Sequence, residues 1–283
     1  LWQHVAMIDI TQSMNTRDML LPVPGGVGGA MAADSRLAFV RHALSRAVGD
    51  LPCGSTLGLG VFTEYRSLLL LAPLEVCSHY DELLAVIGRI DGRMAWASSS
   101  EVTRGVESAL RVADVLALAD KADPPSVIFI TDGHESPPLR GGVLPSIDLP
   151  QRPAPGWIAG VGGDAPMPIP KFDPAGRALG YWEPHEVMQT DGMSLGRTVG
   201  GAQQSLVGDD GKPLEVFRGS GIEHLSSLKE AHLKVVAQAT GLQYRRVVGA
   251  GDLSAMMRAP ALARPVRASA SWRWLPALAA LLL

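Results

Sequence analysis

The strongest constraint on the fold is the alternation of short apolar runs with longer amphipathic stretches. The apolar runs have the length of buried strands and lie at residues 4–10, 55–63, 66–76, 126–133, 156–163 and 242–248. The stretches with helical spacing of apolar residues lie at 34–48, 80–90, 101–121 and 222–241. Such alternation predicts an α/β fold, with a doubly wound, mainly parallel sheet covered by helices on both faces.

One pair of neighbouring strands leaves no room for a helix between them. Residues 55–63 and 66–76 are separated by a very short polar break, which predicts an antiparallel hairpin at the edge of the sheet. A tight turn centred on Tyr65 would place Cys53 opposite Cys77, the two cysteines of the chain, within reach of a disulfide. The alternative is a pair of buried free thiols. A disulfide implies an oxidising compartment such as the periplasm.

The 283 residues suffice for one large domain, which we assign to residues 1–250. Residues 166–221 are rich in Gly and Pro and lack periodicity, so we expect an irregular insertion before the last helix, with one short hairpin. Residues 251–271 are expected to be a linker. The net charge of −3 provides no basic field, so nucleic-acid binding is not expected.

The final residues, 272–283, read WRWLPALAALLL and follow several arginines. We expect this run to begin a membrane anchor, because Trp beside Arg suits a membrane interface. The alternative is a tail helix packed on the domain, since a span needs roughly 20 apolar residues. The flanking arginines favour a cytoplasmic domain, whereas a disulfide favours the periplasm. We expect the periplasm, because long domains are translocated largely regardless of flanking charge.

Hydroxyl and carboxylate side chains follow two of the predicted strands. Asp9, Thr11 and Ser13 come after the first strand, and Asp132 follows the strand at 126–131. A further group of hydroxyls, ending at Ser100, precedes a predicted helix. Because the carboxyl ends of parallel strands meet at one edge of the sheet, these oxygens are expected to converge. Hard oxygen donors of this kind suit Mg²⁺, Ca²⁺ or Mn²⁺.

This pattern resembles the metal-ion-dependent adhesion site of the von Willebrand factor A (VWA) family. The matching residues are Asp9-x-Thr11-x-Ser13 and Asp132 in a Thr-Asp-Gly turn. Ser100 aligns best with the family's central threonine, and Thr103 is the alternative. The resemblance implies that Thr11, Ser13 and Ser100 contact the ion, with Asp9 and Asp132 reaching it directly or through water.

A second stretch, GVGGDAPMPIPKFDPAGRALGYW at 160–182, is similar to membrane-anchored bacterial VWA proteins. These include the BatA and BatB types and the accessory proteins encoded beside methanol dehydrogenase. The segments IDITQSMNTRDM and GYW are most similar to the methanol-oxidation type, and the resemblance extends over most of the chain.

The resemblance implies a binding protein of the cell membrane with its VWA domain in the periplasm, and not an enzyme. Its partner is expected to be another protein that offers an acidic side chain to the bound Mg²⁺ or Ca²⁺. Methanol dehydrogenase, through maturation and calcium insertion, and a sister VWA protein are the candidate partners. The alternatives are a Bat-type factor in envelope stress tolerance and, more remotely, a metal-dependent hydrolase that uses Asp9 and Asp132.

Overall fold

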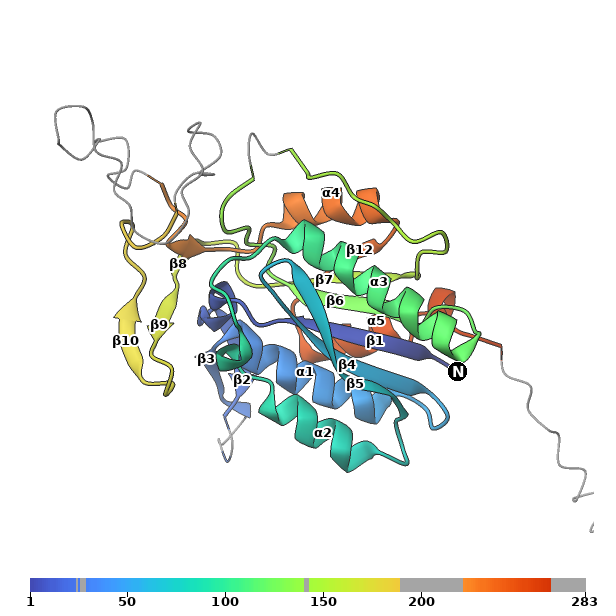
Figure 1. Ribbon diagram of the computed structural model, residues 1–283. Helices are drawn as coiled ribbons and strands as arrows, with labels where there is room; N and C mark the ends of the chain where they lie inside the picture. The colour runs from blue at the N-terminus through green and yellow to red at the C-terminus, as the bar shows by residue number, and fades with distance from the viewer. Residues whose placement is uncertain (24, 26–28, 140–142, 189–220, 266–283) are drawn as a thin grey trace, which may run out of the picture.

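The computed structural model describes residues 1–23, 25, 29–139, 143–188 and 221–265 (Figure 1). In this part of the chain six strands form the main sheet, in the order β12-β7-β6-β1-β4-β5. Their bounds are β1 Gln3–Asp9, β4 Thr56–Thr63, β5 Arg66–Glu75, β6 Ser126–Thr131, β7 Gly156–Val161 and β12 Gln243–Val247. All neighbours are parallel except β4 and β5. The predicted fold class, including its antiparallel edge hairpin, is therefore confirmed.

Helices cover both faces of the sheet (Figure 1). On one face, α1 (Arg36–Asp50), α2 (Tyr80–Arg89) and α5 (Ala250–Met257) bury their apolar residues in one core cluster. On the other face, α3 (Val102–Asp120) and α4 (Glu230–Thr240) contribute to a second cluster. Successive residues of a strand point to opposite faces, so Ala6 and Ile8 of β1 join the first cluster and Val5 and Met7 the second.

The segment between β7 and α4 contains short strands, as expected for an irregular insertion. β9 (Pro170–Phe172) and β10 (Ala178–Tyr181) form the predicted hairpin, which contacts the short helix η1 (Gln12–Asn15). A second pair joins β8 (Met167–Pro168) to β11 (Leu225–Ser226). The part of the predicted insertion at 189–220 lies outside the described residues.

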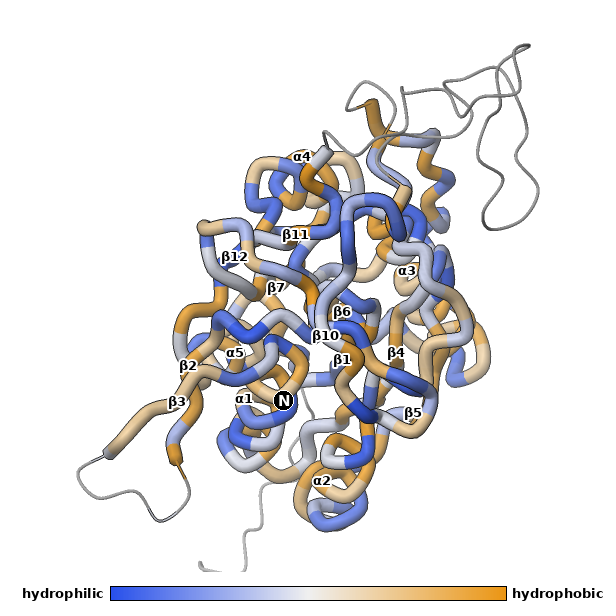
Figure 2. Tube along the Cα trace, turned by 90° about the vertical axis from the view of Figure 1, so that its left-hand side faces the viewer, coloured by the Kyte–Doolittle hydropathy of each residue, from blue (hydrophilic) through white to orange (hydrophobic). Residues whose placement is uncertain are grey.

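An additional hairpin, which the sequence analysis did not predict, lies between β1 and α1. Its strands are β2 (Met19–Pro22) and β3 (Met31–Asp34), and they project from the body of the domain (Figure 2). Both hairpins, β2–β3 and β9–β10, lie near the edge of the sheet where β1 and β6 end (Figure 1).

The prediction of a linker at 251–271 was wrong for its first residues. Ala250–Met257 form α5, which packs against α1, and this is the last described α-helix rather than α4. Leu253, Met256 and Met257 have the i, i+3, i+4 spacing of an apolar helical stripe and are buried. The Ser254 hydroxyl donates to Asp50 at 2.7 Å. The domain therefore continues past residue 250.

The two ends of the described chain meet at the edge of the sheet where β1 begins. The backbone nitrogen of Arg264 donates to the carbonyl of Leu1 at 2.7 Å, and the amino group of Leu1 donates to the carbonyl of Arg264 at 3.1 Å. The predicted anchor at 272–283 lies outside the described residues. Within the described ranges, no helix combines the length and apolar character that a bilayer crossing requires.

The predicted disulfide is present at the open end of the β4–β5 hairpin. Cys53 and Cys77 are bonded, with their Cα atoms 5.3 Å apart. The hairpin turns at Glu64 and Tyr65, and two irregularities in the pairing shift the register between the turn and the cysteines. The bond joins the start of β4 to the segment that leads into α2.

Close packing between two strands gives a first testable prediction. A Cβ added to Gly156 of β7 would lie 1.9 Å from the carbonyl oxygen of Val127 in β6. Because a backbone atom in a central strand cannot move aside, Gly156→Ala is expected to lower the free energy of unfolding by at least about 1–3 kcal/mol. Urea unfolding measures this. The matched control is Gly88→Ala, at an exposed helical glycine with no neighbour within 4 Å, which should be neutral or stabilising. Equal effects of the two changes would contradict the prediction.

Candidate metal centre

The predicted ligand residues lie around the carboxyl ends of β1 and β6, where the strand order reverses. Asp9 ends β1, Thr11 and Ser13 lie on the following turn and η1, and Asp132 follows β6 directly. Strand connections leave β1 and β6 in opposite directions at this point, which is where open α/β sheets bind their ligands. The four side chains are buried, with at most 3% exposed.

Asp9 is held by hydroxyl and backbone donors. Its Oδ1 accepts hydrogen bonds from the backbone nitrogen of Thr11 at 2.9 Å and from the Thr11 hydroxyl at 2.7 Å. Its Oδ2 accepts from the Thr131 hydroxyl at 2.6 Å. The Thr11 and Ser13 hydroxyl oxygens lie 3.3 Å apart. These contacts bring three of the predicted ligands together.

Asp132 is engaged through both carboxylate oxygens. Its Oδ1 accepts from the backbone nitrogen of His134 at 2.9 Å. Its Oδ2 accepts from the Ser226 hydroxyl at 3.2 Å and from the guanidinium of Arg36. Burial alone would raise the pKa of Asp132, but the Arg36 charge and the hydrogen bonds hold that pKa below its usual range. Asp132 is therefore the ionised carboxylate of the site.

Asp9 has the opposite electrostatic environment. Burial and the negative charge of Asp132 raise the pKa of Asp9 from 3.8 to about 7, although the hydroxyls of Thr131 and Thr11 oppose the shift. Two carboxylates thus share a buried site in which the second is costly to ionise. A divalent cation bound beside them would remove that cost.

Ser100 reaches the same edge of the sheet from the loop before α3. A backbone bridge joins Ser100 to Glu64, just beyond β4. Its backbone also exchanges hydrogen bonds of 2.7 and 2.8 Å with Ser136, four residues after Asp132. The Ser100 Oγ is buried and has no hydrogen-bond partner among the described residues. An unsatisfied buried hydroxyl is costly in a protein and is expected where a ligand completes the coordination.

The alternative ligand, Thr103, is already engaged. Its hydroxyl donates to Glu135 at 3.1 Å, and its backbone nitrogen donates to the same carboxylate oxygen at 3.1 Å. The other Glu135 oxygen accepts from the backbone nitrogen of Val102 at 2.9 Å, so Glu135 satisfies the start of α3. The hydrogen bonding favours Ser100 over Thr103 as a metal ligand, and the choice stays a prediction.

Arg36 is the main residue of the site that our sequence analysis missed. It is fully buried, and its guanidinium donates to Asp18 at 2.6–3.1 Å, to the Ser226 hydroxyl at 2.6 Å and to Asp132. The sequence carried a signal. Arg36 lies four residues before Val40 and seven before Ala43, so it shares the helix face on which these two core residues lie. A charged residue on the apolar face of a helix predicts a buried ion pair.

The donor set fits a hard divalent cation. Two carboxylates and three hydroxyls offer oxygen ligands, which Mg²⁺, Ca²⁺ and Mn²⁺ prefer, and neither thiolate nor imidazole is among them. The charge of Asp132 is already paired with that of Arg36, so water-mediated contact suits this residue better than direct contact. The hydroxyl oxygens of Thr11, Ser13 and Ser100 are the better direct ligands.

Comparisons with known proteins identify the fold. No protein-family model and no curated protein matches the sequence. An aerotolerance-related membrane protein from Bacteroides fragilis has a TM-score of 0.52 and 15% identity over 90% of this chain and 95% of its own. BatB from Bacteroides thetaiotaomicron has a TM-score of 0.50 and 16% identity over 90% and 94%. A von Willebrand factor type A protein from Catenulispora acidiphila matches over 91% of this chain and 41% of its own at 12% identity, with a TM-score of 0.41. The chain therefore has the fold of the aerotolerance-related protein and of BatB.

Proposed function

We propose that this protein is a metal-dependent protein-binding scaffold. Its metal centre would bind Mg²⁺ or Ca²⁺, with Mn²⁺ also accepted, through Asp9, Thr11, Ser13, Ser100 and Asp132. The bound ion would then take a carboxylate from an acidic side chain of a partner protein. The observation that carries the proposal is the unpartnered Ser100 hydroxyl at an edge where two buried carboxylates already meet.

The hydrogen bonding supports binding rather than catalysis. Asp132 accepts hydrogen bonds at both oxygens and is paired with Arg36, and Asp9 accepts three hydrogen bonds, so both carboxylates are held in fixed positions, as a preformed ion site requires. The hydroxyls around the carboxylates are suited to be ion ligands and not nucleophiles. A metal-dependent hydrolase is therefore the remote alternative, and phosphatase or nuclease activity lost in Asp9→Ala would establish it.

The proposed location is the cell membrane, with the domain in the periplasm. The Cys53–Cys77 disulfide supports an oxidising compartment, and one protein of the same fold is described as a membrane protein. The chain leaves the described domain after Arg264, at the edge of the sheet opposite Asp9. If residues 272–283 enter the membrane, this arrangement directs the metal centre away from it.

The partner distinguishes two versions of the proposal. The sequence resemblance to the accessory proteins encoded beside methanol dehydrogenase, and to MxaL among them, supports a role in methanol dehydrogenase maturation and calcium insertion, alone or with a sister VWA protein. The shared fold with an aerotolerance-related protein and BatB supports an envelope stress factor equally well. Both versions require the same metal-dependent capture of an acidic partner.

A pull-down tests this function directly. The purified chain, incubated with a membrane and periplasmic extract of its own host, is expected to retain a partner in Mg²⁺ or Ca²⁺ and to release it in EDTA. Asp9→Ala and Ser13→Ala should retain less than about a tenth as much, because each loses an oxygen of the centre. The captured protein's identity separates methanol dehydrogenase from an envelope stress partner.

The matched control replaces an aspartate that is exposed at the far end of α3. Asp120→Ala should retain the partner at the wild-type level. Circular dichroism should show that all the variants remain folded. A partner retained equally in EDTA, or by Asp9→Ala, would contradict metal-dependent binding.

A further inference from the structure

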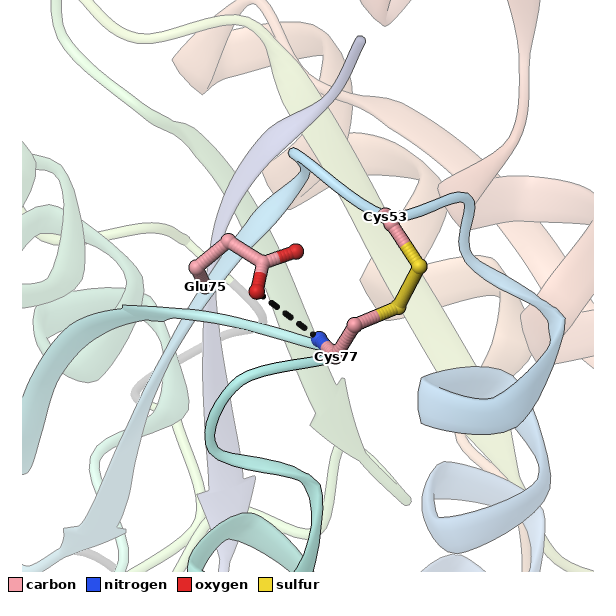
Figure 3. Close-up of side chains that lie close together, drawn as sticks. All are labelled: Cys53, Glu75 and Cys77. Carbon is pink, nitrogen blue, oxygen red and sulfur yellow. Dashed lines mark hydrogen bonds between the residues drawn. A yellow bond between two sulfur atoms is a disulfide. The ribbon is translucent and has the colours of Figure 1, made fainter.

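A group of side chains of the types that bind metals lies at the opposite edge of the sheet from the candidate metal centre. Cys53, Glu75 and Cys77 surround the open end of the β4–β5 hairpin, where β4 begins and β5 ends. One ligand atom from each, the two sulfurs and a carboxylate oxygen, lie within 4.8 Å of one another. Figure 3 shows the Glu75 carboxylate beside the disulfide that joins the two cysteines.

The Glu75 carboxylate is fixed by the backbone of both cysteine segments. Its Oε1 accepts from the backbone nitrogen of Gly54 at 2.5 Å. Its Oε2 accepts from the backbone nitrogens of Cys77 at 3.1 Å and Ser78 at 2.6 Å. These hydrogen bonds lower the pKa of Glu75 from 4.5 to about 2, so the group is an anion. A carboxylate has about four acceptor positions, so Oε1 keeps one for a further ligand.

The hairpin does not depend on the disulfide for its register. The backbone nitrogen of Val76 donates to the carbonyl of Ser55 at 3.0 Å, and Thr56 pairs with Glu75. Val76 itself is buried in the core at 1% exposure. These contacts lie between the two cysteines, so opening the disulfide would leave the sulfurs facing each other. Both cysteines are exposed, which gives a reductant access to them.

We propose that reduction of the Cys53–Cys77 disulfide creates a binding site for a zinc-class cation, formed by two thiolates and the Glu75 carboxylate. A dithiol or phosphine reductant supplies two electrons, and two protons are taken up as the disulfide becomes two thiols. Zn²⁺ then displaces both thiol protons and forms two metal–sulfur bonds. Three protein ligands leave a fourth tetrahedral position for water. Thiolate ligands select zinc-class cations, whereas the oxygen centre at the other edge selects Mg²⁺ or Ca²⁺.

Cobalt binding to the full chain tests the site. After anaerobic reduction with a phosphine, Co²⁺ titration should show one site with thiolate-to-cobalt charge transfer and the visible absorption of tetrahedral cobalt. The oxidised chain and Cys53→Ser should lack this spectrum. Glu75→Gln should weaken Co²⁺ binding at least about tenfold, and added Zn²⁺ should displace the cobalt. Asp9→Asn, the matched control at the other edge, should bind Co²⁺ at this site as the wild type does.

Three results would overturn the proposal. The first is the absence of the tetrahedral spectrum in the reduced chain. The second is an unchanged Co²⁺ affinity in Glu75→Gln, which would mean that the carboxylate is no ligand. The third is loss of the circular dichroism signal on reduction, which would mean that the hairpin does not hold the two thiols in place. None of these outcomes bears on the Mg²⁺ or Ca²⁺ centre, because the two groups share no residue.

Discussion

Replacing Arg36 with Met is expected to lower the free energy of unfolding by about 3–5 kcal/mol. The Arg36 side chain is fully buried, and its guanidinium is shared by Asp18 and Asp132, whose side chains are 8% and 0% exposed. Met fills a similar volume but supplies no charge, so both carboxylates would be left without their counter-ion in a buried site. Removal of one partner from a buried ion pair is costly for this reason.

Urea unfolding in EDTA measures the effect of Arg36→Met without a contribution from bound cations. The free energy of unfolding of Arg36→Lys should lie between those of Arg36→Met and the wild type. Lysine keeps the positive charge but lacks the branched guanidinium group, which contacts Asp18 and Asp132 together. Arg17→Met, at an exposed arginine, is the matched control and should be nearly neutral. A loss below about 1 kcal/mol for Arg36→Met would show that the buried network is not a major source of stability.

Asp9→Asn is expected to stabilise the metal-free protein at neutral pH. The pKa of Asp9 is about 7 in the folded chain and 3.8 in the unfolded reference. The folded state therefore binds the proton more tightly, and its stability falls as pH rises from about 4 to about 7. Asn cannot ionise and avoids this loss, so it should add about 2–4 kcal/mol at pH 8. Its side-chain oxygen can still accept the two hydrogen bonds from Thr11.

Unfolding curves in EDTA at pH 5 and pH 8 test the Asp9 prediction. The wild type should lose more stability than Asp9→Asn between these values. The other ionisable groups are common to both proteins, so the difference between them isolates Asp9. Parallel pH dependence of the two proteins would contradict a raised pKa. Together with the loss of metal binding, the expected gain would mark Asp9 as a residue that serves function at the expense of stability.

The sequence predicted the sheet because its central strands, β1, β4 and β6, are buried on both faces and bounded by clear breaks. Residues 5–8 and 127–130 are continuous apolar runs, and the polar residues that follow them converge at one edge of the sheet. The disulfide was predictable because a short hairpin turn sets approximately which residues lie opposite one another, and the irregularities in the pairing left the two cysteines within bonding distance. Local pattern was sufficient in both cases.

The features that were missed depend on contacts between distant segments. Arg36 meets the Ser226 hydroxyl across 190 residues of sequence, and no local pattern names that partner. The helix α5 is short, so its three apolar residues Leu253, Met256 and Met257 do not identify a helix by themselves. They are buried because α5 packs against α1, which is distant in the sequence. The β2–β3 hairpin is connected by a Gly-rich stretch, and composition alone assigns such a stretch to a loop.

The most direct test of the account is thermal unfolding with and without divalent cations. Mg²⁺, Ca²⁺ or Mn²⁺ should raise the Tm of the wild type above its value in EDTA, since an ion at 100 times its Kd stabilises by about 2.7 kcal/mol. Asp9→Asn and Ser100→Ala should show no such rise, whereas Thr103→Ala should respond like the wild type. A wild-type Tm that is indifferent to all three cations, or an equal rise in Asp9→Asn, would contradict a metal centre at this edge of the sheet.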